Sequence, residues 1–434
     1  MKCINCGTDN NLKDRTANQG RCKQCNHPFA FEPTTMGNVK ITDPMFAKIL
    51  ADISANNTLF FTPKQLLYFL DSRLRNKSFK SLGFAGFYIF FNVWVTGFVG
   101  GILSGIMGSN SFLTANLIYQ ICVVIYLFNN TNSAKLNNAS RKASAKSLQR
   151  LGFLILVVGI LASLFVFNSY ILFIIVVILG MSSIFLGTRQ LGRVDSLAQE
   201  FLISQSYLEG WLERWQQING SLPKILPSPR QEIAPATINP EVTAYSFDRL
   251  VVCDNSTIAQ LLIANNFHFE NNCAILSITG YPQSIFNTTM QMLRRNPDLK
   301  VYALHDCTPR GISLVHRLRS SDSWFLDSNV TIIDVGLLPR QIIATKRGMF
   351  IQNTPSITTE AKKLSQEIRQ SLSAEELAWL DAGNFVELES FTPQRLIKVL
   401  QSGISGSSNL EGDDSSMILI GDSGNDIYMV ESFG

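Results

Sequence analysis

Charged residues are scarce in this sequence. Only 16% of its 434 residues are Asp, Glu, Lys or Arg, whereas 46% are hydrophobic; soluble proteins contain about 25% charged residues. The formal net charge of +4 is small for this length and does not by itself favour a nucleic-acid partner. The composition instead indicates that part of the chain is buried in lipid.

Charge is absent altogether from four long apolar segments. Crossing the core of a bilayer takes roughly 20 helical residues, and these segments approach or exceed that length. The alternative, a buried helical core in a soluble protein, does not account for four such segments without a charge. The predicted membrane spans are residues 82–107, 112–128, 151–167 and 170–187.

Basic residues near the span ends predict the orientation of these helices. The short connections at residues 108–111 and 168–169 contain no Lys or Arg, so both termini are expected on the cytoplasmic side of the plasma (inner) membrane. The basic residues on that side are Arg73, Arg75, Lys77, Lys80, Lys135, Arg141, Lys142, Lys146, Arg150, Arg189 and Arg193.

The spans contain no acid, base or proline, so we expect an anchor in the lipid bilayer and not a transport pathway. Small residues in the first span, such as Gly97, Gly101 and Gly105, favour close helix contacts. These contacts lie either within one bundle or between copies of the chain in a homo-oligomer.

Disulfides and a cleavable secretory signal are not expected. Of the eight cysteines, four form a metal-binding pattern, one lies in an apolar span, and three lie in or just after predicted strands. This distribution predicts a reducing compartment. The first forty residues are polar, unlike a signal peptide.

Cys3-x-x-Cys6 and Cys22-x-x-Cys25 are two knuckles whose separation allows four thiolates to surround one tetrahedral ion. They resemble the zinc ribbons of transcription-factor type found at the head of many prokaryotic proteins. A closed four-cysteine site is structural, so we predict a zinc ion that substitutes for a hydrophobic core. A rubredoxin-like iron site is the alternative. His27 follows a complete ligand set and is interpreted as a bystander.

The segments that flank the spans are predicted to be helical. Thr62-Pro63 is a typical helix start, and an apolar stripe from Leu197 to Trp215 lies either on the membrane surface or against a neighbouring element. The predicted domains are a zinc ribbon (1–35), a helical connector (36–81), the spans (82–190), a juxtamembrane helix (191–219), a linker (220–244), an α/β domain (245–400) and a disordered tail (401–434).

Short apolar strands alternate with helices after residue 245, which predicts a Rossmann-like α/β domain with a mostly parallel sheet. Ligands of such sheets gather at the carboxyl ends of the strands. The predicted strands are residues 249–253, 273–278, 299–304 and 330–335, and the helices between them start near Ser256, Ser284 and Gly311.

These segments resemble, in order and spacing, the Toprim domain of the topoisomerase VI A-subunit family, which includes meiotic relatives. That family has an acidic residue after the first strand, a Gly-Tyr-Pro-like turn after the second, and Asp-x-Asp-Pro-x-Gly after the third. The matching residues here are Asp254, Thr279–Pro282, Asp306–Gly311, Gly336–Pro339 and Glu387–Glu389.

The resemblance implies a Mg²⁺ site built from a glutamate and two aspartates, but this chain departs from it. Asp254 stands in place of the glutamate, Asp306 is kept, and Thr308 stands in place of the second aspartate. Mg²⁺ is therefore expected to bind only weakly, through Asp306 and substrate phosphates. The winged-helix domain that carries the family's catalytic tyrosine has no counterpart ahead of this domain.

The chain is therefore expected to be a membrane-anchored, noncatalytic module that binds nucleic acid, nucleotide or a protein partner. A Mg²⁺-dependent nuclease, such as one acting in defence against foreign DNA, is the alternative, with Asp254 and Asp306 as catalytic candidates. A structural membrane scaffold is a second alternative. The two aspartates also have a simpler interpretation, as caps of the helices that follow them. The candidate ligand-binding residues are Asp254, Gly280, Asp306, Thr308, Arg310 and Gly311.

Overall fold

In the computed structural model the chain divides into two units. The sheet unit comprises residues 1–71, 201–345 and 349–434, and the helix bundle comprises residues 72–200 and 346–348. The expected linker from residue 230 onward and the expected tail beyond residue 406 lie outside the described residues. The structure describes residues 1–37, 39–75, 81–108, 111–133, 136, 138–193, 198–229, 247–294, 296, 298–326, 328–344 and 349–406.

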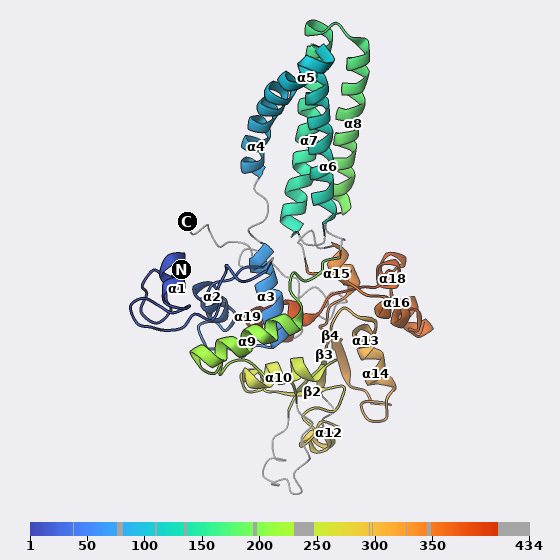
Figure 1. The fold of residues 1–434 in the computed structure, drawn as a ribbon. Helices are drawn as coiled ribbons and strands as arrows, with labels where there is room; N and C mark the ends of the chain where they lie inside the picture. The colour runs from blue at the N-terminus through green and yellow to red at the C-terminus, as the bar shows by residue number, and fades with distance from the viewer. Residues whose placement is uncertain are drawn as a thin grey trace. The chain divides into compact units, whose positions relative to one another are not determined.

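Long apolar helices form the helix bundle (Figure 1). A five-residue π-helical segment, labelled η, lies between α4 and α5, and another forms the last turn after α7. Asn168, with φ 45°, lies in the tight connection before the last helix. The elements are α4 (Ser81–Trp94), η1 (Val95–Val99), α5 (Gly100–Met107), α6 (Ser111–Asn132), α7 (Asn138–Leu161), η3 (Ala162–Val166) and α8 (Tyr170–Arg193).

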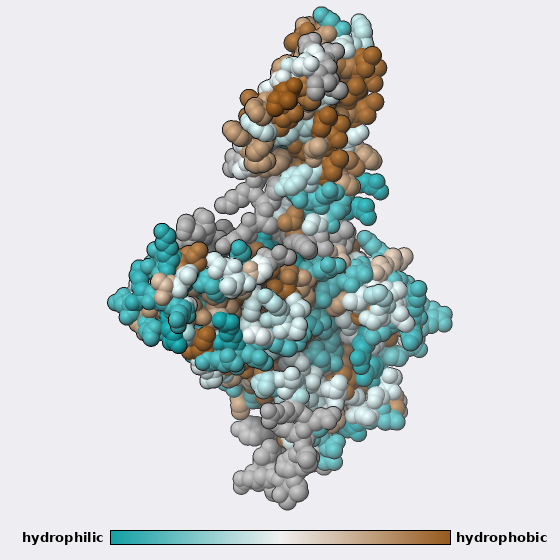
Figure 2. Space-filling model, viewed as in Figure 1, coloured by the Kyte–Doolittle hydropathy of each residue, from teal (hydrophilic) through white to brown (hydrophobic). Residues whose placement is uncertain are grey.

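Four stretches of this bundle are long and apolar enough to cross a membrane: Gly83–Gly105, Ser111–Asn132, Ser140–Val166 and Tyr170–Arg193. At most 33% of the most apolar window of any stretch is buried inside the unit. Hydrophobic residues cover much of the visible surface of these helices (Figure 2). A surface of this kind is typical of helices in lipid and is rare on soluble monomers.

The third helix begins earlier than expected. We placed its start at residue 151, but α7 already begins at Asn138. The basic residues Arg141, Lys142, Lys146 and Arg150 therefore lie in the helix and not in a loop. Hydropathy detects only the apolar part of a helix, whereas Lys, Arg and Ala favour helix at any hydropathy.

Small residues bring α7 and α8 close together. A Cβ atom added at Gly152 would lie 2.7 Å from the carbonyl oxygen of Gly180. In the first span, a Cβ at Gly97, Gly101 or Gly105 would have no neighbour within 4 Å, whereas one at Gly100 would lie 2.8 Å from the ring of Phe112 in α6. Within the bundle, close helix packing therefore occurs between α7 and α8 and, at Gly100, between α5 and α6.

The sheet unit is built on four parallel strands in the order β2-β1-β3-β4, as predicted. Runs of Val, Leu, Ile and Ala form these strands because both faces of a parallel sheet are buried. Their bounds are β1 (Arg249–Cys253), β2 (Cys273–Ser277), β3 (Lys300–Leu304) and β4 (Thr331–Asp334).

Helices cover both faces of this sheet (Figure 1). Val251 of β1 packs in one hydrophobic core with residues of α10, α18 and α19, while Val252 packs in another with residues of α12 and α14. The remaining elements of this region are α10 (Ser256–Ala264), α11 (Phe267–Glu270), α12 (Phe286–Leu293), α13 (Pro309–Ile312), α14 (Leu314–Ser320), α15 (Pro339–Ala344), β5 (Gln352–Asn353), α16 (Pro355–Lys362), α17 (Gln366–Ser371), α18 (Ala374–Asp381), β6 (Asn384–Phe385), the short 3₁₀ helix η6 (Leu388–Ser390) and α19 (Pro393–Gly406).

Helix α19 corrects the expected start of the disordered tail. Residues 401–406 are helical, and Ile404 is buried in the core. The Gly and Ser content of this segment suggested disorder, but Leu396, Val399 and Leu400 continue an apolar stripe that packs on the sheet domain.

The N-terminal segments pack within the same unit through α1 (Leu12–Ala17), α2 (Asp43–Ile53), α3 (Pro63–Arg75) and α9 (Gln205–Asn219). Trp211 and Trp215 of α9 are buried against Phe31 and Phe46, with ring centroids 5.0–6.0 Å apart. The apolar stripe of α9 therefore contacts a neighbouring element, the second of its two interpretations.

Candidate functional site

The four cysteines of the N-terminal segment form a compact cluster. Their sulfur atoms all lie within 4.8 Å of one another, with the Sγ atoms of Cys3 and Cys25 3.7 Å apart and those of Cys6 and Cys22 3.6 Å apart. Among the described residues, no other set of three or more His, Cys, Asp or Glu groups meets this distance. Four thiolates at this spacing fit a tetrahedral ion such as Zn²⁺.

Each knuckle uses the same backbone turn. The amides of Gly7 and Asn26 donate to the carbonyl oxygens of Cys3 and Cys22, at 2.9 and 3.0 Å. Both residues are left-handed, with φ of 74° and 58°, a conformation that Gly and Asn adopt most readily. His27 lies outside the cluster and contacts Asn219, in agreement with its interpretation as a bystander.

A second group of functional side chains lies at the carboxyl edge of the sheet. Asp254 and Asp306 follow β1 and β3, which are neighbours in the sheet. The backbone amide of Asp306 donates to Asp254 Oδ2 at 2.8 Å, and the amide of Leu388 donates to Asp306 Oδ1 at 2.6 Å. Both carboxylates are thus used in bonds that hold the edge together.

Neither aspartate caps a helix, so that simpler interpretation is wrong. The cap of α10 is Asn255, whose side chain accepts from the Ile258 amide at 2.8 Å. The cap of α13 is Thr308, which accepts from the Gly311 amide at 3.0 Å. Each aspartate precedes the capping residue and points elsewhere.

The Glu387–Glu389 segment lies at the same edge. An antiparallel bridge joins Cys307 to Val386, which places the two glutamates beside Asp306. We call Asp254, Asp306, Glu387 and Glu389 the acidic cluster. Desolvation raises the pKa of Asp306 well above its ordinary range, and the charge of Asp254 adds to this shift. Desolvation also raises the pKa values of Asp254 and Glu389.

Side chains from the start of α3, more than 300 positions earlier in the chain, close the acidic cluster. The Lys64 ammonium lies 2.6 Å from Glu387 Oε1, and the Tyr68 hydroxyl donates to Glu387 Oε2 at 2.6 Å. Thr62 donates to Glu389 Oε1 at 2.7 Å. The sequence predicted a helix start here but no role for it, because nothing local to residues 62–68 signals a contact so distant in the chain.

Burial and the charge of Glu387 determine the protonation states of Lys64 and Tyr68. Desolvation lowers the pKa of Lys64, but the charge of Glu387 and its hydrogen bond outweigh that effect, and the pKa is raised. Burial and the charge of Glu387 raise the pKa of Tyr68 well above its usual value. Lys64 is therefore cationic and Tyr68 neutral at pH 7, which makes Tyr68 a poor nucleophile.

A buried ion pair joins the ends of β3 and β4 next to the acidic cluster. His305 is fully buried and lies 3.0 Å from Asp334 at the end of β4. Burial lowers the pKa of His305, but Asp334 outweighs it and raises the pKa to about 9. Gly336 is required beside this pair, since a Cβ there would lie 2.4 Å from the imidazole ring.

The remaining predicted ligand-binding residues lie around the same edge. Gly311 allows α13 to approach the strand end, because a Cβ there would lie 2.2 Å from the Asp306 carbonyl oxygen. Gly280, with φ 85°, forms the turn after β2. The side chain of Arg310 is exposed at the start of α13, as is that of Arg340 at the start of α15.

The order of these segments has a counterpart in a known family. Residues 250–396 match the Toprim domain of the topoisomerase 6 A-subunit/Spo11 family. This confirms the resemblance noted for the C-terminal region, and it covers about a third of the chain. No curated protein and no solved structure matches the chain significantly. Toprim domains are associated with nucleic acids and bind Mg²⁺ in general.

Proposed function

We propose that the chain is a membrane-anchored cytoplasmic Toprim-like module that binds nucleic acid at the carboxyl edge of its sheet without cutting it. Four apolar helices supply the anchor, and the basic residues around their ends favour a cytoplasmic sheet unit. The ribbon is proposed to hold one structural zinc ion, because four thiolates fit that ion and leave no open position.

The observation that carries the noncatalytic part of this proposal is the ammonium group of Lys64. In a working Toprim centre the acidic residues hold Mg²⁺, which neutralises them and polarises a phosphodiester. Here Lys64 supplies positive charge to Glu387 directly, while backbone amides occupy Asp254 and Asp306. Thr308, at the position of the second family aspartate, caps α13 and carries no charge.

In this proposal the acidic cluster binds Mg²⁺ only weakly. Asp254 and Asp306 would hold it together with phosphate oxygens, and the ion would supply charge for the phosphate. The carboxylates of the cluster do not meet the close spacing that the cysteines show. The chain's own residues bind and orient phosphate in this proposal.

Two exposed arginines support a phosphate-bearing ligand. Arg310 and Arg340 begin helices that follow β3 and β4, so both lie at the carboxyl edge. Arginine is well suited to phosphate because its planar fork donates two parallel hydrogen bonds. Contacts of this kind position a nucleic-acid backbone without reading its sequence.

Fluorescence anisotropy tests this proposal with the full-length protein in nanodiscs of uncharged lipid and labelled single- and double-stranded DNA. The Arg310→Ala and Arg340→Ala double variant should bind DNA more weakly. The slope of the logarithm of its binding constant against the logarithm of the salt concentration should become shallower by about 1 for each lost phosphate contact. Arg319→Ala is the matched control, because Arg319 lies at the far end of α14. Equal affinity of all three proteins would overturn the proposed site, and competition by free nucleotide would assign it to a nucleotide.

A Mg²⁺-dependent nuclease is the second candidate, because Asp254 and Asp306 lie on neighbouring strand ends beside two glutamates. It predicts that the wild-type protein cuts DNA when Mg²⁺ is added and that Asp306→Asn abolishes cutting. The noncatalytic proposal predicts no cutting by either protein. It also predicts that Thr308→Asp strengthens metal binding while keeping the cap of α13, since Asp caps as well as Thr.

A further inference from the structure

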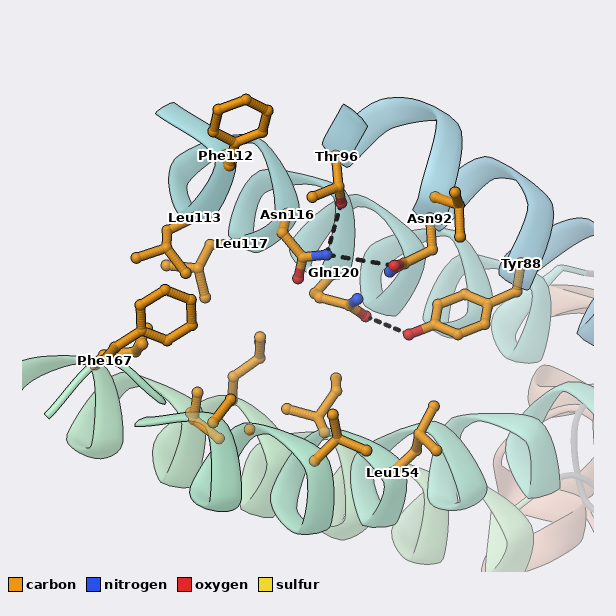
Figure 3. A pocket seen from close by; sticks show the side chains of 18 of the residues that line it. Tyr88, Asn92, Thr96, Phe112, Leu113, Asn116, Leu117, Gln120, Leu154 and Phe167 are labelled. Atoms are coloured by element: carbon orange, nitrogen blue, oxygen red, sulfur yellow. Dashed lines mark hydrogen bonds between the residues drawn. The ribbon is translucent and has the colours of Figure 1, made fainter. Parts of the chain in front are cut away.

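The helix bundle contains a cavity of about 610 Å³ that its role as an anchor does not explain. Ligand pockets have volumes of about 300–1,000 Å³, so this cavity is large enough for a small molecule or a lipid chain. Figure 3 shows side chains of α4, η1 and α6 facing those of α7 and α8 across it. The cavity lies wholly within the bundle.

One wall of the cavity is polar. The side-chain amide of Asn116 donates to Thr96 Oγ1 at 2.8 Å and to Asn92 Oδ1 at 3.4 Å, and Tyr88 donates to Gln120 Oε1 at 2.9 Å (Figure 3). These bonds leave hydrogen-bonding capacity unused. Among the described residues, Asn116 Oδ1, Asn92 Nδ2 and Gln120 Nε2 have no hydrogen-bond partner.

Unused amide groups are costly at this position. Gln120 is only 7% exposed, and the stretches that carry these residues are apolar enough to lie in a membrane. A polar group without a hydrogen-bond partner is strongly unfavourable in hydrocarbon. A ligand that supplies hydrogen bonds to these groups would remove that cost.

The backbone is irregular beside the same cavity. Thr96 lies in the π-helical segment η1, and Ala162 begins η3; both residues line the cavity. Both π-segments of the described bundle thus border the cavity, η1 between α4 and α5 and η3 at the end of α7. Single π-turns inside α-helices, such as η1, occur frequently at functional sites, which is independent support for a binding role.

The lining of the cavity indicates which class of ligand it can bind. The lining residues include no Asp, Glu, Lys, Arg or His, and a charged group is expensive at such a depth. Ile89, Val93 and Val158 line the cavity and are 62%, 68% and 57% exposed. The cavity therefore opens on the outer, apolar surface of the bundle, from which a ligand dissolved in lipid can enter.

We propose that this cavity binds an uncharged lipid that carries a hydroxyl group, such as a diacylglycerol, with its hydroxyl at the Asn92–Asn116–Gln120 wall and an acyl chain along the apolar wall. A hydroxyl both donates and accepts, so it can serve Asn116 Oδ1 and Gln120 Nε2. The inference goes beyond the proposed nucleic-acid function and requires only that the bundle lies in a membrane.

Native mass spectrometry of the full-length protein in detergent, titrated with dioleoylglycerol, tests the proposal. We expect one saturable adduct per chain, and Asn116→Leu should weaken it about 5- to 10-fold, the loss typical of a hydrogen bond. Ala162→Phe, which fills the cavity, should abolish it. Leu161→Phe, at a 53% exposed position outside the lining, is the matched control and should bind as wild type does.

Several outcomes would overturn the proposal. These are non-saturable uptake of dioleoylglycerol, equal binding by Ala162→Phe and wild type, or stronger binding of dioleoyl phosphatidic acid, whose headgroup is charged. Circular dichroism and gel filtration check that each variant is folded. Resistance to alkaline extraction separates the two proposals: an extracted protein refutes the membrane anchor, whereas a resistant protein without an adduct refutes only the lipid site.

Discussion

Replacing Lys64 with Met tests the arrangement of the acidic cluster most directly. Methionine keeps the length and much of the apolar stem of lysine but removes its charge. The ammonium lies 2.6 Å from Glu387 Oε1, and the two side chains are 34% and 16% exposed. After the change, Glu387 loses this cation but remains beside Asp306 and Glu389.

The size of the effect follows from this partial burial. Removing one partner of a buried pair costs about 3–5 kcal/mol, whereas exposed pairs contribute about 0–1 kcal/mol. Since a third of Lys64 is exposed, we expect Lys64→Met to lower the free energy of unfolding by about 1–3 kcal/mol at pH 7. Adding Glu387→Gln should recover most of this loss, because it removes the unpaired charge.

The loss should depend on pH in a defined direction. Desolvation and neighbouring charge raise the pKa values of Asp306 and Glu389 in the folded state. At these two groups the folded state binds more protons than the unfolded state, so their titration favours folding as the pH falls. Without Lys64 these pKa values should rise further, so the destabilisation should shrink as the pH is lowered from 7 towards 5.

Urea denaturation of the full-length protein in micelles, followed by tryptophan fluorescence, measures the effect. Trp324 and Trp379 are buried in the sheet unit and report on its unfolding. Lys362→Met, at an exposed position of α16, is the control and should stay within about 0.5 kcal/mol of wild type. If Lys64→Met is as stable as this control, Lys64 does not neutralise the cluster and the noncatalytic argument loses its main support.

Three further predictions concern the ribbon, the topology and the buried ion pair. Cys22→Ser should release zinc and unfold the ribbon while the spans stay inserted, because the site closes only that small unit; unchanged zinc content in the purified protein would contradict this. A thiol introduced at Ser169 should react with an impermeant reagent outside intact cells and one at Ser228 should not; labelling at Ser228 would place the sheet unit outside. Burial lowers the pKa of His305, but Asp334 outweighs it and raises the pKa to about 9. The ion pair should therefore add up to about 3 kcal/mol to the free energy of unfolding. This contribution should be complete below pH 6.5 and lost as the pH rises through about 9. His305→Gln should abolish this dependence in denaturation curves, and an unchanged alkaline transition would disprove it.

Patterns local in the sequence determined much of the architecture. Long uncharged runs identified four helices, although the start of α7 was missed because its first residues are polar. The spacing of Cys3, Cys6, Cys22 and Cys25 predicted their convergence. Alternation of apolar strands with helices predicted the parallel sheet, and its order of motifs revealed the Toprim resemblance. Each of these features is a repeat or a spacing within one segment.

Only the tertiary structure decided what surrounds the acidic cluster. Lys64 and Glu387 are 323 positions apart and separated by the whole helix bundle, so no periodicity relates them. The same holds for the cavity, whose polar wall combines Asn92 of α4 with Asn116 of α6. Apolar patterning determines which face of a helix is buried, but it does not determine which distant side chain meets it there. Pairings between segments depend on the packing of the whole chain, and the sequence therefore predicted the elements better than the contacts among them.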